Sequence, residues 1–257
     1  MFLCDSHTHL DQYPPSELPQ ILDRAAEAQV DFILCAGTSV ASSRDCIAMA
    51  EENPALYAGV GIHPMDVKSP VDEDTYDALK SLALGSEKVV CISEIGLDFL
   101  PESPDVPTQY QVFREQIRLA KELRLPIIFH SRESHPEVLQ VLREEHVGDV
   151  GAVMHYFQAD ETTAQEVLEL GIYISLARPL TRLPELQELA RTLPMDHIVL
   201  ETDAYPQPFK KHRHSWTEPR HVRQVATTLA ELKGMDLKEV AQVTTANLMG
   251  LLKHHKH

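Results

Sequence analysis

Cysteine is scarce in this chain, and the few cysteines form neither a disulfide framework nor a zinc-binding pattern. Only four occur in 257 residues, and none belongs to a CxxC pair. Cys4, Cys35 and Cys91 lie in apolar runs, where a strand would bury them as small hydrophobic residues. This usage excludes a disulfide-stapled scaffold and fits a reducing compartment.

Long apolar runs are also missing. No stretch approaches the roughly 20 apolar residues that cross a bilayer, and the first residues lack the basic-then-apolar pattern of a secretory signal. We therefore expect a cytoplasmic protein with no membrane contact. Nothing in the sequence indicates an obligate protein partner.

Positive charge is in short supply, with 23 basic against 39 acidic residues and a formal net charge of -16. This balance argues against broad nonspecific adhesion to nucleic acid or to an anionic membrane. It does not exclude a nucleic-acid substrate, because divalent cations and a few local Arg and Lys residues can set the field inside a cleft.

Short apolar runs alternate with longer amphipathic stretches, which is the pattern of repeated βα units around a parallel sheet. Eight runs predict strands, at residues 2–6, 31–36, 56–61, 89–93, 126–129, 151–154, 172–175 and 198–201. Helices are predicted at residues 16–29, 39–53, 109–124, 136–145, 164–170 and 183–193. Eight units in this length predict a single α/β domain over residues 1–257, a TIM-type (β/α)8 barrel. Two extra C-terminal helices, at 218–233 and 236–252, are expected to pack outside it.

Chemically capable side chains follow these runs rather than precede them. His7 and His9 come at the end of the first run, and the later ones are His63, Glu94, His130, His155 and Asp203. Because a TIM barrel places its reactive groups at the carboxyl ends of the strands, we expect all of them at one rim.

Six of these residues have the type and position to ligate metal, which is too many for one tetrahedral ion. Four histidines and two carboxylates suit two divalent ions, with a carboxylate and a water able to bridge them. We assign His7, His9 and Asp203 to the first ion and His130 and His155 to the second, with Glu94 bridging. Mg, Mn or Zn would each fit such a mixed donor set.

Each residue also has a structural interpretation. His130 and His155 could be strand-end histidines that bond the backbone, Glu94 could neutralise an arginine, and Asp203 could cap the next turn. Independent accidents would have no reason to fall at the same end of successive strands, so the joint pattern favours a metal-dependent hydrolase.

The segments around these residues, in chain order, resemble the motifs of the TatD family of metal-dependent deoxyribonucleases. They are His-Thr-His-Leu-Asp from His7, Gly-Ile-His-Pro from Gly61, Glu-Ile-Gly-Leu-Asp from Glu94, His-Ser-Arg from His130, His-Tyr-Phe from His155 and Glu-Thr-Asp-Ala from Glu201. The resemblance spans nearly the whole chain and includes a final helix with Thr-Thr-Ala-Asn from Thr244.

The resemblance implies a two-metal phosphodiesterase on a TIM barrel that cleaves DNA, often from the 3′ end of a single strand, by attack of a metal-bound hydroxide. Asp203 and Glu94 would then be the catalytic residues, with Asp203 as the base that deprotonates or orients water. His63 and Arg132 would contact the substrate phosphate, for which the planar guanidinium is suited. A salt bridge of Arg132 with Glu133 or Glu94 is the alternative.

The chain departs from the family pattern around the substrate mouth. Tyr205 separates Ala204 from the usual proline, and Leu-Ala-Arg-Pro from Leu176 replaces a glycine-rich turn. Residues 205–217 lack helical or strand character and form a candidate substrate loop. Its basic cluster, 210–214, could attract phosphates, with Trp216 or Tyr205 stacking on a base, or could be a solvated loop.

Alternative functions use the same residues differently. A binuclear amidohydrolase or esterase would act on a carbon centre, or on an RNA or aminoacyl-tRNA ester. Many such relatives bridge their metals with a modified lysine at the end of the fourth strand, where this chain has Glu94, while Lys88 lies before the strand. A scaffold that has lost activity would be expected to lack a ligand, and none is missing. His254, His255 and His257, at the chain end, are not assigned to the site.

Overall fold

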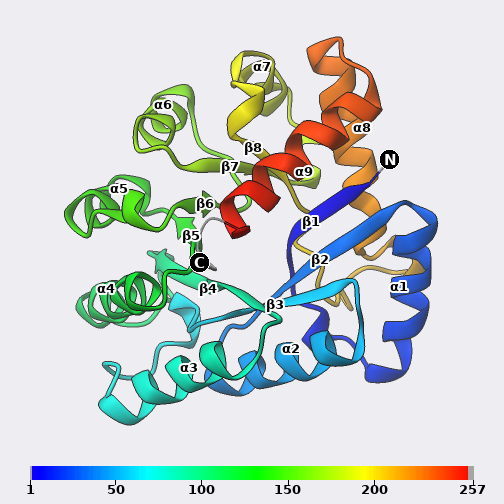
Figure 1. Ribbon diagram of the computed structural model, residues 1–257. Coiled ribbons are helices and arrows are strands. Elements are labelled where there is room, and N and C mark those ends of the chain that lie inside the picture. The colour runs from blue at the N-terminus through cyan, green and yellow to red at the C-terminus, as the bar shows by residue number, and fades with distance from the viewer. Residues whose placement is uncertain (1, 254–257) are drawn as a thin grey trace.

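The computed structural model describes residues 2–253, so His254, His255 and His257 lie outside it. Eight parallel strands pair in chain order, from β1 to β8, and helices surround them (Figure 1). The strands are β1 Leu3–Thr8, β2 Val30–Ala36, β3 Leu56–Val60, β4 Val89–Asp98, β5 Ile127–Arg132, β6 Ala152–Met154, β7 Tyr173–Leu176 and β8 Ile198–Leu200. Thr8, at the end of the first strand, bridges to Ala204 in the segment that follows the last strand. The predicted barrel is confirmed.

Within residues 2–253, seven α-helices connect these strands on the outside, and several begin at a side-chain cap. They are α1 Leu18–Glu27, α2 Val40–Glu52, α3 Glu73–Gly85, α4 Val106–Leu123, α5 His135–Glu144, α6 Glu161–Glu169 and α7 Pro184–Thr192. Asp72, Asp105 and Asp160 each accept a hydrogen bond from a backbone N–H in the first turn of their helix. Helix α3 was not among the predicted helices; it buries only Leu79 and Ala83, which leaves a weak apolar stripe in the sequence.

The two C-terminal helices, α8 Val222–Lys233 and α9 Leu237–Lys253, take different positions. Helix α8 packs outside the barrel as expected, whereas the expectation for α9 was wrong, because α9 crosses the end of the barrel (Figure 1). Its Leu248, Leu251 and Leu252 cluster with strand side chains such as Phe32 and Leu34. These apolar residues seal the amino ends of the strands, which leaves the carboxyl ends open for the site.

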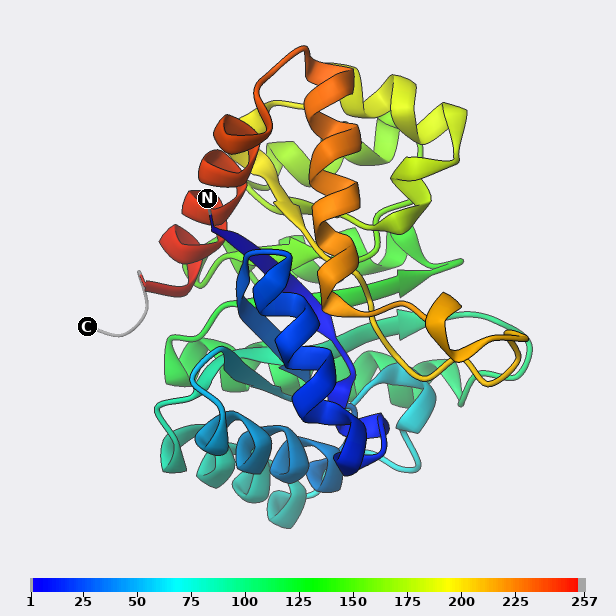
Figure 2. The ribbon, with the colours of Figure 1, turned by 90° about the vertical axis from the view of Figure 1, so that its right-hand side faces the viewer.

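The carboxyl-end rim carries the longest segment without regular helix or strand, between β8 and α8. Figure 2 shows this segment, in orange, reaching out beyond the strands. All four cysteines are buried with free thiols. Within residues 2–253, no helix has the length and apolar character to cross a membrane.

Gly96 in β4 allows the close approach of the neighbouring strand β5. Its φ is +148°, and a Cβ atom built there would lie 2.0 Å from the carbonyl oxygen of His130. Only glycine adopts this φ without strain, so β4 and β5 pair closely beside His130.

We expect Gly96→Ala to lower the free energy of unfolding by more than about 2 kcal/mol, because β5 must move away from the added methyl group. Urea denaturation measures the change. The matched control is Gly85→Ala at the end of α3, where an added Cβ meets nothing within 4 Å. Equal unfolding midpoints for the two variants would contradict the steric argument.

Candidate metal centre

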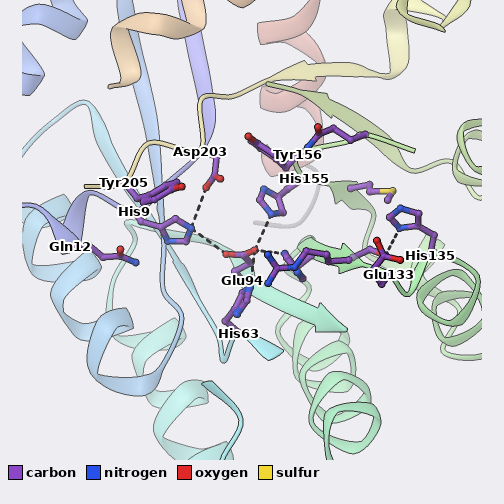
Figure 3. A pocket seen from close by; sticks show the side chains of 15 residues that line it. His9, Gln12, His63, Glu94, Glu133, His135, His155, Tyr156, Asp203 and Tyr205 are labelled. Atoms are coloured by element: carbon purple, nitrogen blue, oxygen red, sulfur yellow. Dashed lines mark hydrogen bonds and ion pairs between the residues drawn. The ribbon is translucent and has the colours of Figure 1, made fainter. Parts of the chain in front are cut away.

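The Glu94 carboxylate is the centre of the cluster at the carboxyl-end rim. Its oxygens lie within hydrogen-bonding reach of five imidazoles, at 3.2 Å from His7, 3.3 Å from His9, 3.4 Å from His63, 3.2 Å from His130 and 3.0 Å from His155. His7 lies in β1 and His130 in β5, while His9, His63 and His155 follow β1, β3 and β6. Figure 3 shows His9, His63 and His155 around Glu94. The structure therefore brings together the predicted histidines and Glu94.

Irregular strand pairing aims the central side chains. The register of β4 shifts between Ile92 and Ile95, and that of β1 shifts between Asp5 and Thr8. Such irregularities change the face toward which a side chain points. Glu94 follows Ser93, and Gly59 of β3 packs closely against Ser93. A Cβ on Gly59 would lie 2.7 Å from the Ser93 Cβ, so the two strands approach closely here only because residue 59 is glycine.

His7, His9 and Asp203 form one side of the cluster. The Nε2 atoms of His7 and His9 are 3.3 Å apart, and Asp203 Oδ1 is 3.5 Å from His9 Nε2. The backbone N–H of Asp203 donates to the carbonyl of His7 at 3.0 Å. This bond fixes Asp203, whose φ is 51°, in the left-handed region that Asp tolerates better than most residues. The three residues predicted for the first ion therefore lie close together, and their shared ion stays a prediction.

His155 is held between two carboxylates. Its Nε2 faces Glu94, and its Nδ1 lies 3.2 Å from Glu201 Oε1. Glu201 is fully buried and also accepts hydrogen bonds from the Tyr156 backbone N–H at 2.7 Å and the Ser175 hydroxyl at 2.5 Å. A carboxylate behind an imidazole fixes the ring and its tautomer, as it commonly does for metal-ligating histidines.

His130 has a similar arrangement with Asp98. Its Nδ1 lies 3.2 Å from Glu94 Oε1, and its Nε2 lies 2.9 Å from Asp98 Oδ2. Arg132 also donates to Asp98, through Nε at 2.7 Å. The arginine therefore forms a salt bridge, but with Asp98 rather than with Glu133 or Glu94. Its side chain stays 46% exposed and lines the cleft.

His63 lies within the histidine cluster itself and not only at the substrate cleft. Its Nδ1 accepts the Met65 backbone N–H at 3.1 Å, which turns Nε2 toward Glu94. Donor atoms of His63, Glu94 and His130 all lie within 4.8 Å of one another. His63 thus has the position of a metal ligand as well as that of a phosphate contact.

The buried charges influence one another strongly. Burial by itself would raise the pKa of Glu94, but His63, His155 and His7 outweigh it and hold that pKa well below its usual range. Burial by itself would lower the pKa of His9, but Glu94 and Asp203 raise it to about 9. Glu94 is therefore ionised and available as a ligand at neutral pH.

The donors fit divalent metal ions. Groups able to hold an ion include His7 with His9 and Glu94, and His63 with Glu94 and His130. Imidazole suits Zn, and carboxylate suits Mg and Mn. The Nδ1 atom of His7 is buried and has no hydrogen-bond partner within residues 2–253. The Nε2 atom of the same ring is the one that faces His9 and Glu94, so a cation held there would bind His7 through Nε2.

The cluster lies in an open cleft of about 630 Å³. Figure 3 shows Tyr156, Tyr205, Gln12 and Glu133 around it. The basic segment 210–214 and Trp216 do not line this cleft. Trp216 packs near Tyr13, with the Arg213 guanidinium 4.6 Å over the Trp216 ring. Of the two rings predicted to stack on a base, Tyr205 is the one that lines the cleft.

Sequence reasoning missed three buried acids behind the site: Asp5, Asp98 and Glu201. Each sits within or directly after an apolar strand and is fully buried. Asp5 accepts the backbone N–H of Thr202 at 2.9 Å, which holds the segment leading to Asp203. A carboxylate inside an apolar run is the signal that would have identified them, because a buried carboxylate needs partners.

A (β/α)8 barrel with this cluster at its carboxyl-end rim fits the class of metal-dependent hydrolases. Comparison with known proteins assigns the family. The family model described as "TatD related DNase" matches residues 4–253, and the chain belongs to the TatD family.

This chain aligns with its relatives over nearly the whole length of both chains. The chain is 36% identical to the uncharacterized metal-dependent hydrolase YabD of Bacillus subtilis, covering 98% of this chain and 99% of that one. It is 30% identical to the 3′-5′ ssDNA/RNA exonuclease TatD of Citrobacter koseri, covering 90% and 91%. The crystal structure of the TatD homologue YjjV from Escherichia coli superposes with a TM-score of 0.88, at 29% identity and 97% coverage of both chains.

Proposed function

We propose that this protein is a two-metal-ion phosphodiesterase that removes nucleotides from the 3′ end of single-stranded DNA. The observation that carries the proposal is the Glu94 carboxylate amid five imidazoles, with Asp203 beside it. Five imidazoles and two carboxylates exceed the needs of one ion but suit two. The ligands would be His7, His9 and Asp203 for one ion, His130 and His155 for the other, and Glu94 between them.

The bound ions would activate water and stabilise charge on the phosphoryl oxygens. Asp203 accepts a proton from the attacking water and holds it in line with phosphorus. Arg132 and His63 donate to the phosphate oxygens, with Asp98 keeping the guanidinium in place. The water oxygen bonds to phosphorus, the bond to the 3′ oxygen breaks, and that oxygen takes up a proton. The products are a 5′-mononucleotide and a strand shortened by one residue.

Four features support nucleic acid over a small carbon ester. The cleft is open and has room for a strand, and Tyr205 and Tyr156 offer rings on which bases stack. One relative is named as an exonuclease on single-stranded DNA and RNA. Lys88, the lysine before β4, donates to the backbone carbonyl of Leu56 away from the cluster, which supports Glu94 as the bridging residue of that strand.

The test uses single-stranded DNA and RNA carrying a label at either the 3′ or the 5′ end. Chelator-stripped protein receives Mg, Mn or Zn separately. We expect metal-dependent release of the 3′ label as a mononucleotide, while the 5′ label remains in a shortening ladder. Early release of the 5′ label would reverse the direction. Inactivity on both polymers, with two ions bound and turnover of a carboxyl ester or amide, would move the reaction to a carbon centre.

A further inference from the structure

A second hollow adjoins the metal centre and is lined by positive charge. It encloses about 350 Å³ and is lined by Arg178, Arg182 and Lys210. Tyr156, Asp203 and Tyr205 line both this hollow and the cleft of the metal centre. A substrate whose scissile phosphate lies at the metal centre can therefore extend directly to these three cations.

The fold holds the hollow together from two rim segments. Arg178 opens the short helix Arg178–Thr181 directly after β7, and Lys210 comes from the segment after β8. The Arg178 Nη1 donates to Thr217 Oγ1 at 2.8 Å, and the Lys210 Nζ donates to Gln207 Oε1 at 2.6 Å. Gln207 Oε1 also accepts the Thr217 backbone N–H at 2.9 Å. This frame positions Arg178 and Lys210 before any ligand arrives.

The three cations lack acidic partners, although the chain carries 39 acidic residues and a net charge of -16. Within residues 2–253, none of the three forms a salt bridge, and Asp203, at the boundary with the metal centre, is the one carboxylate that lines the hollow. Arg213, from the same segment as Lys210, is instead paired with Glu17 and Glu218. Free cations facing one hollow distinguish it from the neutralised surface nearby.

The cations also repel one another. Burial and the nearby Arg182 lower the pKa of Arg178, and burial together with Arg178 and Arg182 lowers the pKa of Lys210. A bound anion would relieve both the repulsion and the lost solvation. Arginine suits a phosphate because its planar donors bind two oxygens at once.

We propose that this hollow binds the phosphate that flanks the scissile phosphate in the substrate strand. The link to a strand rests on the proposed function, whereas the phosphate site follows from the hollow itself. In a strand digested from its 3′ end, the flanking phosphate is either the next one upstream or a phosphate on the 3′ terminus. Both have the same chemistry, and either anchors the strand while the metal centre acts on its neighbour.

The kinetic test compares three thymidine dinucleotides as substrates of the metal-loaded protein: one unphosphorylated, one with a 5′ phosphate and one with a 3′ phosphate. We expect kcat/KM to rise about tenfold or more with one of the added phosphates, as charge-assisted hydrogen bonds provide. Preference for the 5′ phosphate assigns the upstream position, and preference for the 3′ phosphate assigns the terminus. Equal kcat/KM for all three would overturn the proposal.

The variants separate the hollow from general electrostatics. Arg182→Gln and Lys210→Ala should each reduce the preference for the added phosphate, mainly through KM. Lys211→Ala is the matched control, because Lys211 is the next residue, is exposed and does not line the hollow. An equal loss in Lys211→Ala would show that only overall charge matters and would contradict a defined site.

Calorimetry with inorganic phosphate keeps this proposal distinct from the proposed function. We expect the Arg178→Gln/Arg182→Gln chain to bind one phosphate fewer than the wild-type chain. That result, without hydrolysis of any dinucleotide, would reject the nuclease and retain the phosphate site. Hydrolysis without a phosphate preference, together with unchanged phosphate stoichiometry in the double variant, would retain the nuclease and reject the phosphate site.

Discussion

Glu94→Gln should abolish hydrolysis and reduce the metal content of the protein. The amide has no negative charge and one fewer acceptor oxygen, so it cannot bridge two ions as a carboxylate does. We expect kcat/KM to fall by at least about 10³-fold, since the loss affects charge stabilisation at the reacting phosphate. Metal content after gel filtration, together with kcat/KM under excess metal, measures the two effects.

Glu133→Gln is the matched control for this variant. Glu133 is an exposed carboxylate that lines the same cleft. Figure 3 shows it at the edge of the cleft, apart from Glu94. Its substitution should leave both metal content and turnover near the wild-type values. If Glu94→Gln retained two ions and full turnover, Glu94 would not be the bridging ligand.

Asp203→Asn should remove turnover while the fold and part of the metal binding persist. Asparagine has nearly the same shape and tolerates the positive φ of this position, so the backbone bond to His7 can remain. The amide cannot take a proton from water. We expect kcat to fall by about 10²- to 10⁴-fold, the usual range for the loss of a general base, with a smaller change in KM.

Three measurements on Asp203→Asn separate the base from a structural role. Circular dichroism and the thermal midpoint report the fold, and metal titration reports occupancy. Asp11→Asn is the control, because Asp11 also follows β1 at the rim but bonds the Ser42 hydroxyl at 2.7 Å rather than the cluster. Wild-type kcat in Asp203→Asn at equal metal occupancy would exclude Asp203 as the base.

The residues predicted to follow the strands do lie together at the carboxyl-end rim, while their ligation of metal stays a prediction. The placement of His7, Glu94, His130 and Asp203 beside apolar runs was enough to expect them at one rim, because parallel strands in a barrel all end on the same side. Finer detail was not predictable. The fourth strand was expected to end at Ser93 but continues to Asp98, so Glu94 lies inside it at an irregular pairing.

Two errors have a common physical cause. Helix α3 lacked a strong apolar stripe, and α9 was placed outside the barrel although it covers one end. The spacing of apolar residues along a helix predicts that one of its faces is buried. It does not predict which surface of the protein covers that face. The leucines of α9 pack against strand side chains at the amino end of the barrel. No local sequence pattern specifies that partner surface.

The sequence by itself determined the order of the strands, the barrel and the residues able to ligate metal, because these follow from periodicity and from the chemistry of single side chains. Only the tertiary structure decided which atoms meet. It placed five imidazoles on one carboxylate, set Glu201 and Asp98 behind two of them, and joined Arg178 to Lys210 across 32 positions of chain at one hollow. Distances of about 3 Å between residues far apart in sequence depend on register and packing, which a single chain of letters does not specify.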